Sequence, residues 1–264
     1  MSAPARSLDG KVVVISGVGP GLGRTLALQC AERGAKLVLG ARSAGLLDQL
    51  AVEIVEAGGE ALAVPTDVAD PQACARLIDA AVNRFGGIDG LVNSAFRFEI
   101  GRFEGADLAS WRDAMNVTCF GALELAQAAV PHLRARGGGS IVNVSTLSTR
   151  IPTDGAGGYG IAKAALDMAT RQLATELGPY GIRVNATLMG WMDGEPLRQG
   201  FAGRAEARGM TVEALMTELT ASIPLRRIPT DTECARSVIF FLSDDASPIT
   251  GALLNVNGGQ YMGT

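Results

Sequence analysis

Tyr159 and Lys163, in the segment "YGIAKAAL", set a phenol and an ammonium four positions apart. On a helix, residues at this spacing share one face, about one turn apart. A phenol has an unperturbed pKa near ~10, and a neighbouring ammonium stabilises the phenolate and lowers that pKa toward the working pH. The pair therefore predicts a tyrosine that acts as a general acid or base. The same spacing also occurs by chance on helix surfaces, so the surrounding sequence must support this interpretation.

A glycine-rich turn follows the first apolar run, in "VVVISGVGPGLGRTLAL". A bound pyrophosphate needs backbone N–H groups at a helix N-terminus and no side chains in the way. We predict that Gly17 makes the turn, that Gly21 admits the phosphate and that Gly23 lets the helix pack closely, with Leu22 at the same cofactor site. A glycine-rich turn without a ligand is the alternative.

The second apolar run ends at Ala41 and Arg42, where the adenosine ribose of a bound dinucleotide would lie. An acidic residue at this point binds the ribose 2′-hydroxyl and repels a 2′-phosphate. The chain has alanine there, followed by arginine, which favours NADP over NAD. The alternative is that Arg42 is only a solvated residue at the start of a helix.

Apolar runs alternate with amphipathic segments along the chain. Predicted strands lie at 11–17, 36–42, 60–68, 88–95, 139–146, 182–190 and 251–259, and predicted helices lie at 23–35, 44–59, 71–87, 108–133 and 162–178. Strands that are apolar on both faces and separated by helices indicate a parallel sheet covered on both sides. The sequence therefore predicts an α/β fold with a doubly wound, seven-stranded parallel sheet and helices on both faces.

No linker or change of composition divides the chain, so we predict one domain over residues 1–264. The segment of about 190–230 is rich in glycine, proline and charge but contains amphipathic pieces such as "TVEALMTELTAS". A helical lid over a pocket is the favoured interpretation, and a disordered loop is the alternative.

The composition excludes several classes of function. With 47% hydrophobic and 19% charged residues, the chain can bury a sizeable core. A formal net charge of −4 and no basic stripe argue against nucleic acid as a partner. The polar start "MSAPARSLDG" does not resemble a signal peptide, and no apolar run is long enough for a membrane span. We expect a soluble, cytoplasmic protein with no membrane partner.

The cysteines and the histidine offer no metal site. Cys30, Cys74, Cys119 and Cys234 are scattered without a ligand-type spacing, so reduced, buried thiols are expected. The single histidine, His132, lies where a helix is predicted to end, which disfavours a histidine-based metal site or a Ser-His-Asp triad.

Taken together, these motifs resemble the short-chain dehydrogenase/reductase family in its single-domain branch. The resemblance extends from the glycine turn "SGVGPGLG" to "NVNGG" near the C-terminus. Between them lie "TDV" with Asp67, "NSAF" from Asn93 to Phe96, "WRDAMNVTCFG" with Asn116, and the Tyr159–Lys163 pair. The resemblance implies a Rossmann-like fold, a nicotinamide cofactor, NAD(P)(H) with a preference for NADP(H), and hydride transfer between that cofactor and a secondary alcohol or ketone.

The resemblance also assigns roles to individual residues. Tyr159 exchanges a proton with the substrate oxygen, Lys163 lowers the tyrosine pKa and binds the nicotinamide ribose, and Asn116 holds a water that relays protons. The residues expected to bind the cofactor, besides those of the glycine turn and Arg42, are Asp67, Val68, Asn93, Ala95, Tyr159, Lys163, Gly190 and Met192.

A hydroxyl from the fifth predicted strand should orient the substrate oxygen, and two residues compete for this role. The family's serine position corresponds to Thr146, which also carries a donor–acceptor hydroxyl. Ser145 is one residue earlier, and adjacent strand residues point to opposite faces, so Ser145 can serve only if the chain bulges there. Thr146 is the favoured candidate, and the other possibility is that neither residue contacts the substrate.

The chain departs from the family pattern at two places. Phe96 replaces a glycine beside the cofactor, so its ring either enters the substrate pocket or packs on a nearby loop. Met189 and Gly190 replace a Pro-Gly pair at the pocket mouth. Several apolar residues hint at a hydrophobic or cyclic substrate, although such residues also simply pack: Ile151, Pro152, Trp191, Met192, Phe201 and Met210.

These departures leave a second hypothesis open, a nucleotide-binding sensor or scaffold of the same fold without turnover. Asn116, Tyr159 and Lys163 argue against it, because a pure binder has no need of all three. The long apolar helices around 108–133 and 162–178 are compatible with a homo-oligomer, either a dimer or a tetramer, as in the family that the chain resembles.

Overall fold

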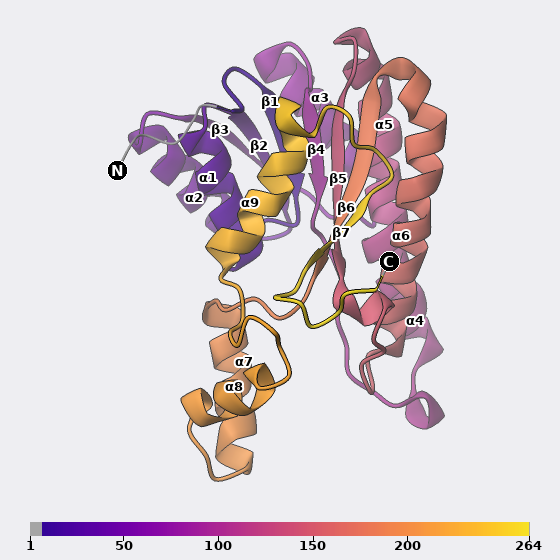
Figure 1. The fold of residues 1–264 in the computed structure, drawn as a ribbon. Coiled ribbons are helices and arrows are strands. Elements are labelled where there is room, and N and C mark those ends of the chain that lie inside the picture. Colours follow the sequence, from indigo (N-terminus) through magenta and orange to yellow (C-terminus); the bar gives the residue numbers. More distant parts are fainter. Residues whose placement is uncertain (1–6, 264) are drawn as a thin grey trace.

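All seven predicted strands form, and they make one parallel sheet (Figure 1). The structure, a computed structural model, describes residues 7–263. The strands are β1 (Val12–Ser16), β2 (Lys36–Ala41), β3 (Glu60–Pro65), β4 (Gly90–Asn93), β5 (Gly139–Thr146), β6 (Ile182–Met189) and β7 (Leu253–Val256). Their order is β3-β2-β1-β4-β5-β6-β7, and neighbouring strands are parallel. The predicted fold class is confirmed.

Helices cover both faces of the sheet because its strands are apolar on both sides (Figure 1). One face carries α1 (Leu22–Glu32), α2 (Ala44–Glu56) and α9 (Asp231–Leu242), and the other carries α3 (Pro71–Phe85), α5 (Gly121–Ala135) and α6 (Gly157–Leu177). Strand β1 serves both layers, since Val13 and Ile15 pack into the first core while Val12 and Val14 pack into the second.

The helix predicted over 108–133 forms, but a π-helical turn divides it. It consists of α4 (Leu108–Met115), a π-helical turn (Asn116–Phe120) and α5. At the end of the π turn, a Cβ on Gly121 would lie 2.7 Å from the Val68 carbonyl oxygen. The chain therefore passes this point in contact with the loop after β3, and π turns of this kind often occur at functional sites.

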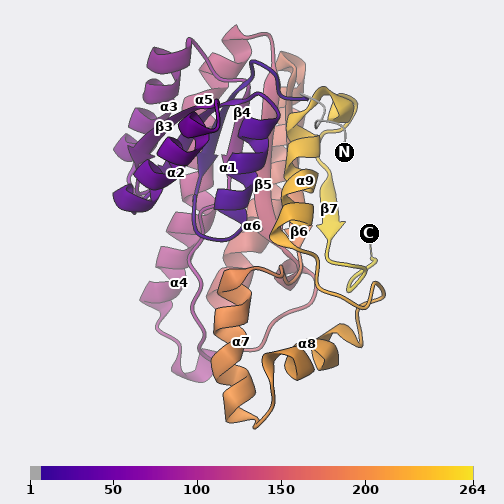
Figure 2. The same ribbon diagram turned by 90° about the vertical axis from the view of Figure 1, so that its left-hand side faces the viewer.

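Two helices extend beyond the carboxyl ends of the strands (Figures 1 and 2). They are α7 (Glu195–Ala207) and α8 (Val212–Thr220), and they share a small core of Phe201, Leu215 and Ile223. The two ends of this segment meet, because Asp193 and Thr230 form an isolated parallel bridge and the Asp193 N–H donates to the Pro229 carbonyl at 2.8 Å.

Other predictions concern the chain as a whole. The four cysteines are free and buried, as expected. Within residues 7–263, no helix is long and apolar enough to cross a membrane. The prediction that the first ten residues do not form a signal peptide concerns residues 1–6 in part, and these lie outside the described residues.

Candidate active site

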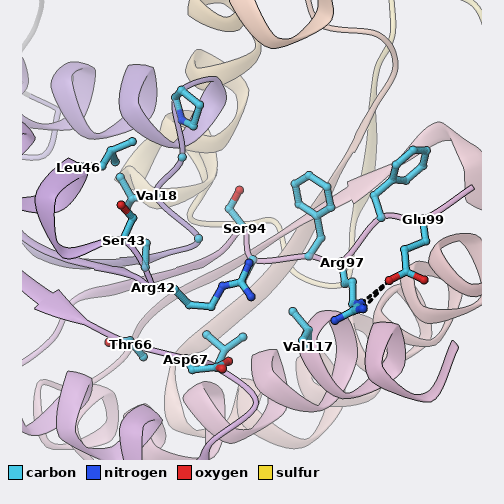
Figure 3. A pocket seen from close by; sticks show the side chains of 18 residues that line it. Val18, Arg42, Ser43, Leu46, Thr66, Asp67, Ser94, Arg97, Glu99 and Val117 are labelled. Atoms are coloured by element: carbon cyan, nitrogen blue, oxygen red, sulfur yellow. Dashed lines mark hydrogen bonds and ion pairs between the residues drawn. The ribbon is translucent and has the colours of Figure 1, made fainter. Parts of the chain in front are cut away.

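A cavity of about 560 Å³ opens at the carboxyl ends of β1 to β4 (Figure 3). The sheet order changes direction here, because β1 lies between β2 on one side and β4 on the other. Doubly wound sheets bind their ligands in the crevice outside such a switch point. The cavity walls come from the glycine turn after β1, the chain after β2 and β3, and the loop after β4.

The glycine turn shapes one end of this cavity. Gly17 has φ +79°, and a Cβ there would lie 2.2 Å from the backbone nitrogen of Ala95, so only glycine fits between β1 and the β4 loop. Gly19 has no atom within 4 Å of a Cβ position and faces open space. At Gly23, a Cβ would lie 2.8 Å from the Val18 Cα, within the turn itself.

The N-terminus of α1 begins at this turn without a side-chain cap. Its N-cap, Gly21, turns toward Pro196 of α7 and Asp231 of α9, at 3.4 and 3.7 Å from a Cβ position, and Leu22 is buried behind it. The uncapped N–H groups of a first helical turn suit an anionic group. Gly19 therefore joins the predicted glycines as a position from which a ligand can approach the backbone.

Arg42 and Asp67 project into the other end of the cavity (Figure 3). Arg42 is exposed and forms no ion pair within the part of the chain that the structure describes, whereas Arg97 in the same cavity donates to Glu99 at 2.7 Å. The Asp67 carboxylate accepts a hydrogen bond from the Ala69 N–H at 3.0 Å, and Val68 is buried in the wall. Arg42 is thus an unpaired cation at the edge of the cavity.

Asn93 lies behind the cavity and not in its wall. Its side-chain amide donates to Asn143 of β5 at 2.9 Å, and the Asn143 amide donates to Thr170 of α6 at 2.9 Å. This buried chain of hydrogen bonds joins β4, β5 and α6. The following residues, Ser94 to Phe98, line the cavity instead, and Ala95 is among them.

Two aromatic rings from this loop pack against Tyr159. Phe96 and Phe98 contact it edge-on, with ring centroids at 5.8 and 5.1 Å. The Lys163 ammonium also lies 5.8 Å from the Phe96 ring centroid. Phe96 lines the large cavity and packs on Tyr159, whereas Phe98 borders the smaller pocket described below.

Tyr159, near the start of α6, is partly buried and lines one pocket with Thr146. Burial raises the pKa of its phenol, while the neighbouring Thr146 hydroxyl opposes that rise. Lys163 is not among the groups that shift the phenol pKa in this structure, so its expected lowering of that pKa stays a prediction. The reason is geometric: the ammonium is 6.0 Å from the Tyr159 ring centroid and donates to a backbone carbonyl instead.

Lys163 is almost fully buried, with 2% of its surface exposed. Its Nζ donates to the Val144 carbonyl at 2.5 Å. Burial lowers its pKa to about 8, while Asp167 and Cys119 act in the opposite direction. A lysine in this state changes charge within an accessible pH range.

Thr146 and Ser145 point to different partners, as alternation along β5 predicts. Ser145 is buried and its Oγ donates to the Asp167 carboxylate at 2.5 Å. The second carboxylate oxygen lies 3.4 Å from the Arg150 guanidinium. Thr146 is therefore the hydroxyl next to Tyr159, and Ser145 is occupied on the other face. The sequence analysis did not single out Asp167, although its spacing of four residues from Lys163 places it on the same face of α6.

Asn116 begins the π-helical turn and is exposed. Its backbone carbonyl accepts from the Gly121 N–H. Within residues 7–263 no side-chain hydrogen bond links Asn116 to Tyr159 or Lys163, so its relay role remains a prediction.

A smaller pocket of about 270 Å³ is lined in part by Tyr159. Its walls combine apolar side chains with hydroxyls, and its lining residues include Phe98, Ile151 and Trp191 together with Thr146, Ser148 and Thr153. Met189 and Gly190 lie at its edge, while Met192 is partly buried against the core on the α1 face. Tyr159 thus lines the compact, amphipathic pocket, and Phe98 borders both this pocket and the larger cavity.

The comparisons with known proteins agree with this geometry. A family model described as enoyl-(acyl carrier protein) reductase matches residues 17–260. The 2,5-dichloro-2,5-cyclohexadiene-1,4-diol dehydrogenase LinX of Sphingobium indicum is 33% identical, covering 98% of this chain and 99% of that protein. L-sorbose reductase from Gluconobacter frateurii, complexed with NADPH and L-sorbose, has a TM-score of 0.93 at 29% identity, covering 97% of this chain and 98% of that one.

A second solved structure, NAD+-bound xylitol dehydrogenase, has a TM-score of 0.88 at 27% identity, covering 96% of this chain and 99% of that one. The fold and the matched residues together define an oxidoreductase of the α/β class. The chain belongs to the short-chain dehydrogenase/reductase family, as its motifs predicted.

Proposed function

We propose that this protein is an NAD(P)-dependent oxidoreductase that moves a hydride between nicotinamide and a secondary alcohol or ketone carbon of a cyclic substrate. The observation that carries the proposal is the position of Tyr159. Its side chain lines the amphipathic pocket together with Thr146 and Phe98, Phe98 also borders the large cavity, and the buried Lys163 lies one helical turn away.

The cavity supports a dinucleotide cofactor. The uncapped start of α1 and the open approach at Gly19 suit a pyrophosphate, and Asp67 and Val68 line the end where adenine would lie. A bound nicotinamide cofactor would donate or accept the hydride. Arg42 supports a preference for NADP(H), because an unpaired guanidinium attracts a 2′-phosphate. The preceding residue, Ala41, carries no acidic group that would repel this phosphate.

In the proposed reaction each side chain handles the substrate oxygen or the proton. Tyr159 donates a proton to the oxygen in reduction and removes it in oxidation. Thr146, which lines the same pocket as the phenol, orients the same oxygen. Lys163 binds near the nicotinamide ribose and, when charged, stabilises the phenolate. Asn116 is proposed to hold a water at the π-helical turn.

The pocket favours a ring-shaped substrate that carries hydroxyl groups. Phe98, Ile151 and Trp191 provide apolar walls, while Ser148 and Thr153, whose oxygens are 3.1 Å apart, provide hydrogen-bonding partners. Two matched relatives are named for a cyclohexadiene-diol and for L-sorbose, which fits this chemistry. We further propose that the segment of about 190–230 acts as a lid, since Trp191 from the pocket wall packs on Phe201 of α7 at 5.4 Å.

The experiment is a thermal-shift comparison of NAD+, NADH, NADP+ and NADPH, followed by a panel of cyclic diols, cyclic ketones and sugars monitored at the nicotinamide absorbance. Tyr159→Phe should retain cofactor binding and lose turnover by roughly 10²–10⁴-fold, the usual effect of a lost general acid or base. Unchanged turnover in this variant would reject the role of Tyr159. Cofactor binding without turnover on any panel member would instead favour a sensor or scaffold.

We also propose that the protein is a homo-oligomer. A groove of about 430 Å³ between α5 and α6 exposes apolar side chains that include Leu123, Val130 and Leu173. Light scattering coupled to size exclusion should give a dimer or tetramer, and a mass near 27.3 kDa would contradict this.

A further inference from the structure

We propose that Asp167 is a positioning residue of this site: its buried carboxylate anchors the end of β5 through Ser145 and provides the counter-charge for the Lys163 ammonium. The inference rests on the proposed function for its catalytic meaning. Its physical content, an electrostatic link between two buried side chains, is testable without turnover.

The anchoring part follows from the contacts of Asp167. Its side chain is 5% exposed, so the carboxylate has little contact with water. One oxygen accepts the Ser145 hydroxyl at 2.5 Å, and the other lies 3.4 Å from the Arg150 guanidinium. A buried carboxylate is stable only when it is paired and hydrogen-bonded in this way. The group is therefore held in one place, and it holds Ser145 in return.

Ser145 lies between the two β5 residues that bind the predicted catalytic pair. The Val144 carbonyl accepts from Lys163, and Thr146 lines one pocket with Tyr159. Thus two consecutive residues of β5 hydrogen-bond two residues of α6 spaced four apart, at 163 and 167, and the next β5 residue lies beside position 159. Because Asp167 fixes the middle residue, it fixes the spacing between strand and helix on which the other two contacts depend.

The electrostatic part follows from the surroundings of Lys163. Burying an ammonium is costly unless an opposite charge is near. The titratable and charged groups that face it are Asp167 and Tyr159 from α6 itself and Cys119 from the π-helical turn, while Arg150, after β5, acts through Asp167. Cys119 is a buried thiol whose pKa is raised by burial, which leaves Asp167 as the nearby anion.

The consequence for the proposed reaction is that Asp167 extends the pH range over which Lys163 is charged. A charged Lys163 is the form that stabilises a phenolate and binds ribose hydroxyls. Without the carboxylate, burial would drive the lysine to its neutral form at a lower pH.

The test uses the lysine content of the chain, which has only Lys11, Lys36 and Lys163. In protein labelled with ¹³C-lysine, the Cε signals give three titrations, and Lys163→Met identifies the signal of interest. Lys11 and Lys36 are surface ion-paired residues and serve as internal references. In the wild type, the Lys163 midpoint is expected near pH 8.

Asp167→Asn keeps the shape and the oxygen that accepts from Ser145 but removes the charge. It should lower the Lys163 midpoint by at least about one pH unit, the effect of losing one nearby opposite charge. Ser145→Ala removes the hydrogen bond to Asp167 and keeps the Asp167 charge. In this variant the Lys163 midpoint should stay within a few tenths of a pH unit of the wild-type midpoint. An unchanged midpoint in Asp167→Asn would overturn the proposal.

Two further measurements test the proposal, the wild-type titration by itself and the pH dependence of cofactor affinity. If Asp167→Asn does not fold, the wild-type titration still decides, since a midpoint below about pH 6 is that of a buried lysine without an effective counter-charge and would refute the proposal. If Asp167→Asn folds, its affinity for the preferred nicotinamide cofactor should begin to fall at a lower pH than that of the wild type as the pH is raised. Near pH 6 the two proteins should bind this cofactor equally well. A protein that shows the shifted titration but no turnover would reject the proposed function and leave the role of Asp167 intact.

Discussion

Replacing Lys163 with methionine should stabilise the fold while abolishing turnover. The pKa of Lys163 falls from its ordinary value of 10.5 to about 8 on burial. A shift of about 2.5 units, at ~1.36 kcal/mol per unit, means that the charged lysine costs the folded state roughly 3 kcal/mol. Methionine fills the same space without a charge. Because Val144 loses its donor and Asp167 its counter-charge, we expect a net gain of roughly 1–3 kcal/mol near neutral pH.

The sign of the pH dependence follows from proton binding. Between pH of about 8 and 10.5 the unfolded lysine holds a proton that the folded one has released. Stability rises with pH wherever the unfolded state binds more protons, so the wild type gains stability over this window and the variant does not. The advantage of Lys163→Met should therefore be complete below pH of about 8 and vanish toward pH of about 10.5.

Urea unfolding at fixed protein concentration, at several pH values across this window, measures the difference between the two proteins. Lys36→Met is the matched control, since Lys36 is a partly exposed lysine paired with Glu60 at 3.0 Å. Its effect should be within ~1 kcal/mol and nearly independent of pH. A wild type more stable than Lys163→Met near neutral pH, or a difference that does not change with pH, would refute the reasoning.

Three further predictions test the cavity and the hydroxyl. Gly17→Ala should lower the melting temperature strongly, because the added Cβ would lie 2.2 Å from the Ala95 nitrogen. Gly19→Ala should keep the melting temperature, because its Cβ would have no atom within 4 Å, but it should weaken cofactor binding. In calorimetric titrations Arg42→Ala should weaken NADPH binding by about tenfold or more and leave NADH nearly unchanged, as expected for a lost charge-assisted contact; equal losses for both would remove its role. Thr146→Val should lose turnover by roughly 10²-fold while Thr146→Ser retains most of it, and initial rates on one cyclic substrate would show whether the hydroxyl matters.

The fold was predictable because its signals are local. The strands are short, largely apolar runs, such as Val12 to Ile15, and helical segments separate them along the chain. The ends of helices also have local sequence signals. Helix α3 has Asp70 as its capping side chain, Pro71 at its first position and Gly86 in the left-handed conformation at its end. These features need no knowledge of distant contacts.

The details of the site depend on contacts that no spacing reveals. The π-helical turn that begins at Asn116 ends next to Gly121, which packs closely against Val68, whereas the pattern of apolar residues predicts one uninterrupted helix. The raised pKa of Tyr159 comes from burial against Phe96 and Phe98, which join it from another part of the chain. Motif matching placed Tyr159 and Lys163 on one helix, but the partner of the ammonium depends on which β5 carbonyl lies beside it.

The bridge between Asp193 and Thr230 has a consequence for how this protein could diversify. The two ends of the α7–α8 segment are joined by backbone hydrogen bonding, so the segment forms a closed loop with its own core next to the sheet. The free energy of closing such a loop changes only slowly with its length. A segment of different length, taken from a relative, could therefore be grafted between residues 193 and 230 to alter which molecules are accepted, while the sheet and the helix α6 that carries Tyr159 and Lys163 stay in place.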